Sequence, residues 1–335
     1  MYKISIIMPI FNTEKYIERS FNSILNQTMN LEDIEVIMVD DCSTDNTRNI
    51  VREYEKKYPN FKAVYHEKNS GGCAVPRNSG LKVATGEYVM FLDPDDEYAP
   101  DMCETLYNKI KTNNVELVKC NHELIVNNKS TIDYNFNKEI PEIILDCKQD
   151  APSNSVSVCN VIHDRKFLEK NNITFPELKN AEDGIFSITE FFKANKMIIL
   201  NNYAGYKYYT NPEISHSMKG TSENLEIILS GLFTIRDIIK KNGRTEIYHD
   251  FFSVYSFQFF LRVLNYNGNK TKYFKKFYEF ERSLNCTLTF KYSWLNLVNK
   301  FIVKNHISLA VFVFNGLTLI RKTPFIKIYR KLLFR

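Results

Sequence analysis

The chain has 335 residues, of which 44% are hydrophobic and 25% are charged, so its composition excludes a disordered or low-complexity protein. Its seven cysteines include no C-x-x-C pair, which argues against a zinc site and indicates reduced cysteines in a cytosolic protein. The net charge is +5, but the stretch after Glu281 holds ten Lys or Arg and no acidic residue. Removing these ten charges leaves −5 for the rest of the chain.

Strand and helix patterns alternate over the first hundred residues. Apolar, β-branched runs predict strands at Lys3–Ile10, Ile34–Val39, Phe61–His66 and Glu87–Leu92. The helices expected between them run from a Thr13 cap to about Gln27, from an Asp45 or Thr44 cap to about Tyr58, and from about Val75 to Ala84. Repeated strand–helix units predict a parallel sheet with helices on both faces.

The pattern changes twice beyond residue 100. We expect a helix at Met102–Asn113, a strand at Val115–Cys120, an irregular polar stretch over 121–150, a strand at Val156–Ile162, a helix at Ala181–Ala194, and short strands at Met197–Leu200 and Ala204–Tyr209. After Ser222 the pattern is helical, over Leu225–Lys241, Glu246–Tyr266, Tyr273–Ser283 and Trp294–Lys304 onward. The sequence therefore predicts an α/β domain over 1–220 and a helical domain over 221–335.

Three carboxylates crowd together directly after the fourth predicted strand. They are Asp93, Asp95 and Asp96 in the segment FLDPDD. Like charges this close raise each other's pKa, and a bound divalent cation removes that penalty. Mg²⁺ and Mn²⁺ take one or two carboxylates together with phosphate oxygens, and the ends of parallel strands are where α/β sheets bind ligands. The competing interpretation is an acidic turn that caps the next helix.

Two further polar segments follow the second and third predicted strands. Asp40 and Asp41 lie in VDDCSTD, where a carboxylate can accept a hydrogen bond from a nucleobase imide, or where Asp40, Ser43 or Asp45 caps a helix. The segment from Asn69 to Gly80 combines glycines with Arg77 at a helix start, which suits a phosphate. It matches neither the P-loop nor the dinucleotide fingerprint, so kinases, ATPases and dehydrogenases are disfavoured.

An ordered series of motifs resembles the family-2 glycosyltransferases with the GT-A fold. The series is MPIFN at 8–12, ILNQT at 24–28, VDDCSTDNT at 39–47, NSGGCAVPRNSGL at 69–81, GEYVMFLDPDD at 86–96 and AEDGIF at 181–186. The resemblance implies a Rossmann-like mixed sheet flanked by helices, and it covers about residues 4 to 220. The forms VPRNSGL and AEDGIF, with a later His216-Ser217, are similar to bacterial enzymes that glycosylate wall teichoic acid or build capsule polysaccharide.

The resemblance also implies roles for individual residues. Asp183 would be the catalytic base, and Mn²⁺ or Mg²⁺ would be held at Asp93 with Asp95 or Asp96, and by His216 on a looser match. The donor-binding residues would be Pro9, Phe11, Asp40, Asp41, Asn69, Arg77, Asp93, Glu182 and His216. Cys42 departs from the family, where many relatives have glycine. The other histidines, His66 among them, are interpreted as structural or surface residues.

The function expected from this resemblance is inverting, metal-dependent transfer of a sugar from a UDP-sugar to a cell-surface polysaccharide or teichoic-acid-like acceptor. UDP-GlcNAc, UDP-Glc and UDP-Gal remain open as donors. One alternative is a nucleotidyltransferase, which usually carries a Gly-rich loop where this chain has PIFNTEKY. A second alternative is a glycan-binding adaptor without activity, against which Asp93, Asp95 and Asp183 argue.

The basic segment Arg321–Arg335 mixes positive charge with apolar side chains, which is typical of binding to an anionic membrane surface. A homo-oligomer contact and a site for a polyol-phosphate or lipid-linked acceptor remain as alternatives, and no nucleic-acid motif accompanies the charge. The apolar run Ile307–Ile320 is broken by Asn315 and Gly316 and is shorter than the roughly 20 residues a bilayer requires. We expect a cytoplasmic protein, peripheral on the inner face of the plasma membrane.

Overall fold

The computed structural model describes residues 1–126, 129–134, 139–152, 156–179, 181–209, 220–290 and 292–321. The chain forms two units, Met1–Ile214 and Ser215–Arg335. The boundary near residue 220 that the sequence suggested falls just inside the second unit.

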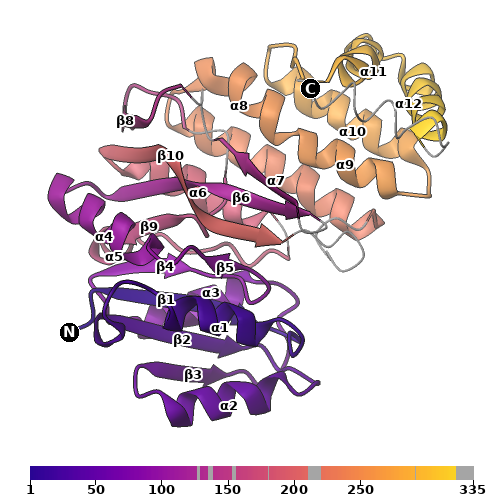
Figure 1. Cartoon of the computed structure of the whole chain (residues 1–335). Coiled ribbons are helices and arrows are strands. Elements are labelled where there is room, and N and C mark those ends of the chain that lie inside the picture. The colour runs from indigo at the N-terminus through magenta and orange to yellow at the C-terminus, as the bar shows by residue number, and fades with distance from the viewer. Residues whose placement is uncertain are drawn as a thin grey trace. The chain divides into compact units, whose positions relative to one another are not determined.

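Four parallel strands form one half of the sheet in the first unit. They are β1 (Ile4–Ile10), β2 (Ile34–Asp40), β3 (Phe61–Tyr65) and β4 (Tyr88–Phe91), in the order β3-β2-β1-β4. Every residue of β1 and β2 is buried, as expected for strands covered on both faces. This half of the sheet agrees with the strands predicted from the apolar runs (Figure 1).

Helices connect these strands and cover the sheet. They are α1 (Ile17–Leu25), α2 (Thr47–Lys57) and α3 (Ala74–Val83), and α4 (Met102–Asn113) follows the two-residue strand β5 (Glu97–Tyr98). α1 buries Ile17, Phe21 and Ile24, which recur at the spacing of one helix face. α3 packs so closely on β1 that a Cβ at Gly80 would lie 2.3 Å from Ile7 Cγ2. Only glycine permits that approach, which holds the residues of α3 against the sheet.

The second half of the sheet is mixed. It contains β6 (Leu117–Val126), β7 (Lys129–Asp133), β8 (Glu142–Asp146), β9 (Val161–Asp164) and β10 (Lys196–Tyr209), with α5 (Arg165–Lys170) and α6 (Glu182–Lys193). β9 is antiparallel to both β4 and β6, whereas β10 is parallel to β6. The parallel arrangement predicted from the strand–helix alternation of the first hundred residues therefore does not extend into this half. The mixed sheet implied by the family resemblance is confirmed.

Several predicted boundaries are corrected by the structure. The side chain of Thr13 does not cap α1. The Thr13 carbonyl accepts from the N–H groups of Tyr16 and Ile17, and the helix begins only at Ile17. The strand expected at Val156–Ile162 begins only at β9. The two short strands expected over 197–209 are one strand, β10, with register shifts after Leu200. Within 121–150, predicted to be irregular, the structure has the end of β6 together with β7 and β8.

The second unit is helical in the part that the structure describes. Its helices are α7 (Ser222–Lys241), α8 (Tyr248–Tyr255), α9 (Phe257–Asn265), α10 (Lys270–Ser283), α11 (Ser293–Val303) and α12 (Ile307–Arg321), with a short 3-10 turn, η3 (Thr245–Ile247), before α8. The single helix predicted for Glu246–Tyr266 is interrupted at Ser256. Buried aromatic rings form the core, and the Phe259 and Phe277 rings stack with centroids 4.9 Å apart.

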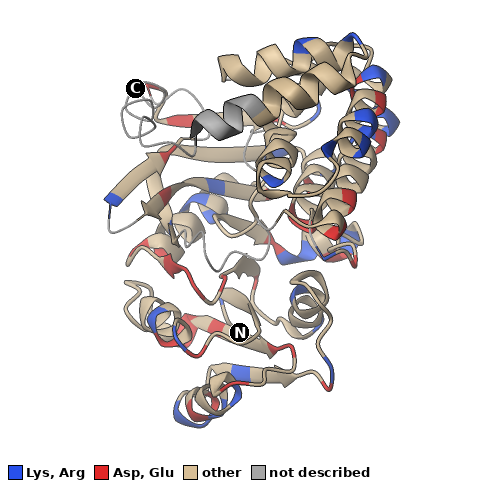
Figure 2. Cartoon of the chain, turned by 90° about the vertical axis from the view of Figure 1, so that its right-hand side faces the viewer, with Lys and Arg blue, Asp and Glu red and all other residues tan. Residues whose placement is uncertain are grey.

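Figure 2 shows both basic and acidic residues on the helices of this unit. None of the helices in the described residues has the length and apolar character needed to cross a bilayer. The basic segment predicted to meet a membrane lies, apart from Arg321, outside the described residues, so its membrane, polymer and oligomer interpretations stay predictions.

Candidate active site

The residues singled out from the sequence gather at one edge of the sheet. β1, β2 and β4 are parallel and end at this edge, and β10 points the same way because β9 is antiparallel to both β4 and β6. Asp40 ends β2, the segment with Asp93 follows β4, and α6 begins at Glu182. The carboxyl ends of parallel strands are where open α/β sheets bind ligands, so this edge is the candidate active site.

Arg77 lies at the centre of the site and joins three carboxylates. Its side chain is 2% exposed, and its Nη2 atom lies 2.9 Å from Asp93 Oδ1. Its Nη1 atom lies 2.5 Å from Asp183 Oδ1 and 3.5 Å from Glu182 Oε1. A buried guanidinium is costly unless it is paired, and here it is paired with carboxylates from two separate segments. Arg77 therefore links the segment after β4 to the first turn of α6.

This arrangement refines the role expected for Arg77. The family resemblance placed it near the donor diphosphate, whereas its Nη atoms contact carboxylates of the protein itself. Its guanidinium also lies 5.3 Å from the centre of the Phe175 ring. Arg77 is thus set to fix the positions of Asp93 and Asp183 relative to each other.

The acidic pair at the start of α6 is strongly perturbed. Burial and the charge of Asp183 raise the pKa of Glu182 to about 7. Burial also raises the pKa of Asp183, although the Arg77 guanidinium opposes that rise. Ala181, just before the pair, has a φ of 68°, which costs a residue with a Cβ about 1–2 kcal/mol. Perturbed pKa values and backbone strain both concentrate at functional sites.

The three aspartates after β4 have different surroundings. Asp96 is 1% exposed, and its carboxylate accepts hydrogen bonds from Tyr206 Oη at 2.6 Å and Tyr209 N at 2.8 Å. Asp95 is exposed, and its pKa is raised to about 6 by loss of surrounding water and by the Asp93 charge, a rise that solvent partly screens. Asp96 therefore fixes the loop against β10, and this leaves Asp93 and Asp95 as the carboxylates best placed to meet a ligand.

The loop that carries these aspartates is also held by α1. Ser20 Oγ donates to the carbonyl oxygens of Pro94 and Asp96, at 2.8 and 2.6 Å. The Arg19 guanidinium donates to the Asp95 carbonyl oxygen and lies 3.7 Å from the centre of the Tyr209 ring. The loop is thus fixed at both its backbone and its acidic side chains.

A divalent cation fits this loop only as a partner of a bound phosphate. The described residues contain no group of three or more His, Cys, Asp or Glu side chains arranged to hold a metal by themselves. Mg²⁺ and Mn²⁺ at phosphate-transfer sites need only one or two carboxylates, which Asp93 and Asp95 can supply. His216, predicted as a further ligand, lies outside the described residues.

The loop after β2 is built around two buried carboxylates. Asp40 Oδ2 pairs with Arg48 Nε at 2.6 Å, and Asp40 Oδ1 accepts from Ser43 N at 3.2 Å. These contacts of Asp40 hold the turn in place. Asp41 is 2% exposed, and both of its oxygens accept hydrogen bonds from the segment that follows β3.

The remaining predicted donor residues lie around this loop. Pro9 is buried within β1, and Phe11, just beyond its end, is 42% exposed. Asn69 is exposed, and its Nδ2 atom donates to the carbonyl and Oδ2 atoms of Asp41, each at 3.1 Å. The structure thus brings Pro9, Asp41 and Asn69 to the same edge as the Arg77 cluster.

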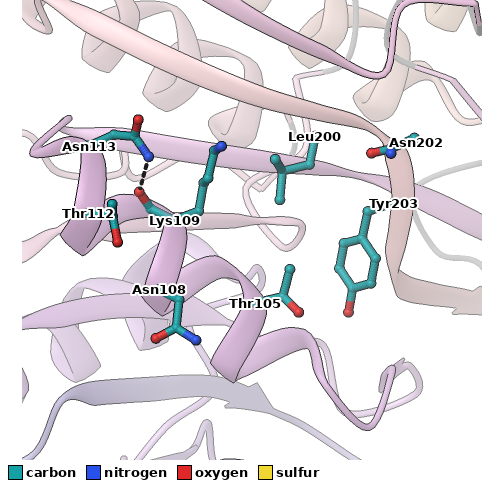
Figure 3. Close-up of a pocket in the computed structure, with 8 residues that line it drawn as sticks. All are labelled: Thr105, Asn108, Lys109, Thr112, Asn113, Leu200, Asn202 and Tyr203. Carbon is teal, nitrogen blue, oxygen red and sulfur yellow. Dashed lines mark hydrogen bonds between the residues drawn. The ribbon is translucent and has the colours of Figure 1, made fainter.

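A groove of about 570 Å³ occupies another part of the first unit (Figure 3). It lies between α4 and the middle of β10, and its lining residues are Thr105, Asn108, Lys109, Thr112, Asn113, Leu200, Asn202 and Tyr203. Thr112 and Asn113 come at the end of α4, shortly before β6 begins, so the groove extends away from the edge that holds Asp93. It contains none of the predicted site residues.

Three residues of the site were not recognised from the sequence. His66, interpreted as structural or exposed, contacts Asp41, and Tyr206 and Tyr209 bind Asp96. A usable signal was present for the tyrosines, because they end a strand that was predicted correctly at its carboxyl end. Contacts from a parallel strand at the same edge are expected to reach the loops of its neighbours.

The similarity of this chain to known proteins extends over both units. The model of glycosyl transferase family 2 matches residues 5–170. The chain is 35% identical over 259 residues to the poly(ribitol-phosphate) beta-N-acetylglucosaminyltransferase TarP of Staphylococcus aureus, which covers 74% of each protein. It is 35% identical over 208 residues to the poly(ribitol-phosphate) beta-glucosyltransferase of Bacillus spizizenii, covering 62% of this chain and 32% of that relative. The chain thus spans about a third of the length of the latter protein.

The fold has a close counterpart among solved structures. The crystal structure of residues 1–349 of S. aureus TarS in complex with UDP-GlcNAc matches with a TM-score of 0.74 and 26% identity, covering 94% of this chain and 91% of that one. The predicted GT-A fold with a helical C-terminal region is therefore confirmed. Because the similarity to TarP extends over 74% of both proteins and the family model matches residues 5–170, this chain belongs to glycosyl transferase family 2.

Proposed function

We propose that the protein is an inverting, metal-dependent glycosyltransferase that moves a sugar from a UDP-sugar to a teichoic-acid-like polyol phosphate or another cell-surface polysaccharide. The observation that carries the proposal is the buried Arg77, which holds Asp183 and Asp93 on opposite ends of one guanidinium. A proton acceptor and a phosphate-facing carboxylate are the two groups that sugar transfer from a nucleoside diphosphate requires.

Asp183 would accept the proton of the attacking hydroxyl group. For this it must be ionised. Burial raises the pKa of Asp183, and the Arg77 guanidinium opposes that rise and so favours the anion. The helix dipole at the first turn of α6 favours the anion as well. A single base with in-line attack produces inversion at the anomeric carbon.

The donor would lie across the carboxyl ends of β1, β2 and β4. Asp41, Asn69, Pro9 and Phe11 surround the position for a nucleobase, and Asp93 and Asp95 would hold Mn²⁺ or Mg²⁺ against the diphosphate. When bound, such an ion neutralises the negative charge that develops on the leaving UDP. Arg77 would contribute by fixing the base and the metal-binding loop through its contacts with Asp183 and Asp93, and Glu182 would support Arg77 from 3.5 Å.

The names of the relatives support the choice of substrates. TarP is named for transfer of N-acetylglucosamine to poly(ribitol phosphate), and the B. spizizenii protein for transfer of glucose to the same polymer. TarS has been solved with UDP-GlcNAc. UDP-GlcNAc and UDP-glucose are therefore the first donors to test, with UDP-galactose third. Family membership and the acidic site together disfavour the nucleotidyltransferase and adaptor alternatives.

The proposal is tested by binding and by turnover. Titration calorimetry should detect UDP binding in the presence of Mn²⁺, and it should weaken when EDTA replaces the metal. Release of UDP from one of the three UDP-sugars should depend on added poly(ribitol phosphate). A protein that binds none of these nucleotides with Mn²⁺ present is not the proposed transferase.

A further inference from the structure

Asp41, a histidine and a serine are linked in series by a chain of hydrogen bonds. His66 Nδ1 lies 2.7 Å from Asp41 Oδ1, and His66 Nε2 lies 3.0 Å from Ser79 Oγ. Asp41 follows β2, His66 follows β3 and Ser79 belongs to α3, so the chain joins three elements. The His66 side chain is 18% exposed and that of Asp41 is 3% exposed, so water competes weakly for these bonds.

The backbone of His66 is fixed as firmly as its ring. Its N–H donates to the Asp40 carbonyl at 2.9 Å, and its carbonyl accepts from Arg48 Nη2 at 3.1 Å. Arg48 is itself paired with Asp40. Asp40 and Arg48 therefore fix the position from which the His66 ring contacts Asp41.

The partners define which ring nitrogen carries the proton. An ionised carboxylate can only accept, so Nδ1 of His66 donates to Asp41. In the neutral ring Nε2 then has no proton and accepts from the Ser79 hydroxyl. In this tautomer the Nδ1–H group of His66 donates to Asp41 Oδ1, and the Ser79 hydroxyl holds the ring in that orientation.

The two carboxylate oxygens of Asp41 accept different numbers of hydrogen bonds. Oδ2 accepts from Asn69 Nδ2 at 3.1 Å, Ser70 N at 2.9 Å and Ser70 Oγ at 2.8 Å. Oδ1 has only the His66 bond among these contacts. A carboxylate offers about four acceptor sites, two on each oxygen, so Oδ1 retains the capacity for one more donor.

We propose that His66 is a positioning residue that orients Asp41 so that Oδ1 accepts the imide N–H of a uracil ring, and that this contact gives the site its preference for uracil over cytosine. The proposal rests on the proposed function. Uracil carries a hydrogen on its ring nitrogen between the two carbonyl groups, whereas cytosine has a lone pair there, which a carboxylate repels. Orientation of Asp41 thus affects which base binds and leaves the chemistry at Asp183 unchanged.

The same three residue types, Asp, His and Ser, also form hydrolytic triads, but the surroundings differ here. Ser79 lies inside α3, where the backbone N–H groups are used by the helix itself. A hydrolytic serine needs free donors nearby to stabilise the oxyanion. The chain of bonds is therefore suited to holding Asp41 in place.

Three variants separate the contributions of the chain. His66→Leu removes both bonds, His66→Asn keeps an N–H group near the position of Nδ1, and Ser79→Ala removes only the support of Nε2. His249→Leu is the control, because His249 is 46% exposed in the second unit and contacts Asp250. Calorimetry with Mn²⁺ measures binding of UDP, CDP and pyrophosphate to each protein, and thermal unfolding shows whether each variant is folded.

We expect His66→Leu to weaken UDP binding about 10-fold or more, because a hydrogen bond to a charged group is lost. Binding of CDP and pyrophosphate should stay at the wild-type level, so the preference for UDP shrinks. His66→Asn should recover most of the UDP affinity, Ser79→Ala should lose about threefold, and the control should lose none. In turnover assays KM for the UDP-sugar should rise in His66→Leu while kcat stays within about twofold.

Each other outcome has a definite meaning. Wild-type protein that binds no UDP with Mn²⁺ present contradicts the proposed function itself. Wild-type protein that binds UDP, together with a His66→Leu variant that binds it equally well, overturns the role of His66 alone. Equal loss of UDP and pyrophosphate binding by a folded His66→Leu variant also overturns it, because the effect is then not specific to the base. If His66→Leu does not fold, the comparison of His66→Asn with Ser79→Ala decides by the same criteria.

Discussion

Glu35 at the amino edge of the sheet and Glu182 at the carboxyl edge are both shielded from water, yet their pKa values move in opposite directions. The side chain of Glu35 is 0% exposed. Burial alone raises its pKa, but bonds from Lys62, Ser5 and Thr85 outweigh burial and hold the pKa below its ordinary value. The Lys62 Nζ and Ser5 Oγ atoms each lie 2.5 Å away, and Thr85 N lies 2.8 Å away.

Glu182 has no such set of donors. Its side chain is 12% exposed, its contact with Arg77 is long at 3.5 Å, and Asp183 stands beside it with the same charge. Burial and that charge raise its pKa to about 7. The buried charge of Glu35 is thus compensated by its hydrogen-bond donors. Glu182 belongs to a cluster in which three carboxylates share the one guanidinium of Arg77. The difference separates the edge that holds the fold together from the edge that we expect to bind substrate.

The largest effect is expected for Asp183→Asn, which removes the proposed base and keeps its shape. Sugar transfer should fall by about 10³-fold or more, because a general base contributes 10² to 10⁴ and the amide cannot take the proton. UDP binding with Mn²⁺ should remain near the wild-type value. Steady-state transfer and calorimetry measure the two quantities on the same preparation.

The matched control for this variant is Asp237→Asn, an exposed carboxylate on α7. It should retain wild-type transfer. Normal turnover in Asp183→Asn would show that Asp183 is not the base. The carboxyl edge of the sheet would then lack the catalytic group that we propose for it.

A smaller effect, on stability, is expected for Glu35→Gln and Glu182→Gln. Glu35→Gln should lower the free energy of unfolding at pH 7 by about 2–3 kcal/mol, because charged hydrogen bonds in the interior are lost. Glu182→Gln should raise it by roughly 1–3 kcal/mol at pH 8, because an unfavourable buried charge is removed. Thermal unfolding of the metal-free variants at steps from pH 3 to pH 8 measures both.

The dependence on pH has opposite signs for the two glutamates. The stabilisation from Glu35 is present above its unfolded pKa of about 4.5 and is lost as pH falls through its lower folded pKa, so the deficit of Glu35→Gln should shrink in acid. Folded Glu182 keeps its proton up to about pH 7, whereas the unfolded chain releases it near 4.5. The free energy of unfolding of the wild type should therefore decrease as pH rises from the unfolded pKa to the folded pKa. Glu182→Gln lacks this titration, so its stability should depend less on pH over the same range. Parallel profiles for all three proteins contradict the comparison.

Local patterns in the sequence were sufficient for the first half of the sheet and for the motifs. Strands β1, β2 and β4 are mainly apolar and fully buried, and Asp93 and Asp183 lie in recognisable segments. β10 was predicted as two short strands on either side of Asn201 and Asn202, whereas Asn201 Nδ2 donates to Ile140 O and Asn202 N donates to Pro141 O within one continuous strand. Contacts with such partners leave no periodic signal in the sequence.

The partners of the site residues were also beyond local reasoning. Arg77 meets Asp183 across 106 positions of the chain, so only the folded sheet shows that one guanidinium serves both the base and Asp93. The spacing of the three aspartates after β4 likewise gave no sign that Asp96 bonds to β10. The roles assigned to these residues in catalysis and metal binding stay predictions until the variants are measured.

The smallest effect concerns the backbone at the two edges. At the amino edge, a Cβ at Gly86 would lie 2.6 Å from Ser5 N, so glycine is needed beside the residue that binds Glu35. At the carboxyl edge, Cys42 follows Asp41 with a φ of 65°, a conformation that favours glycine. Cys42→Gly should raise the free energy of unfolding by about 0.5–1 kcal/mol, measured by denaturant titration, because relief of backbone strain outweighs the greater freedom of the unfolded chain. A decrease would show that the contact of Cys42 Sγ with Glu67 O at 3.4 Å stabilises the loop by more than the strain costs.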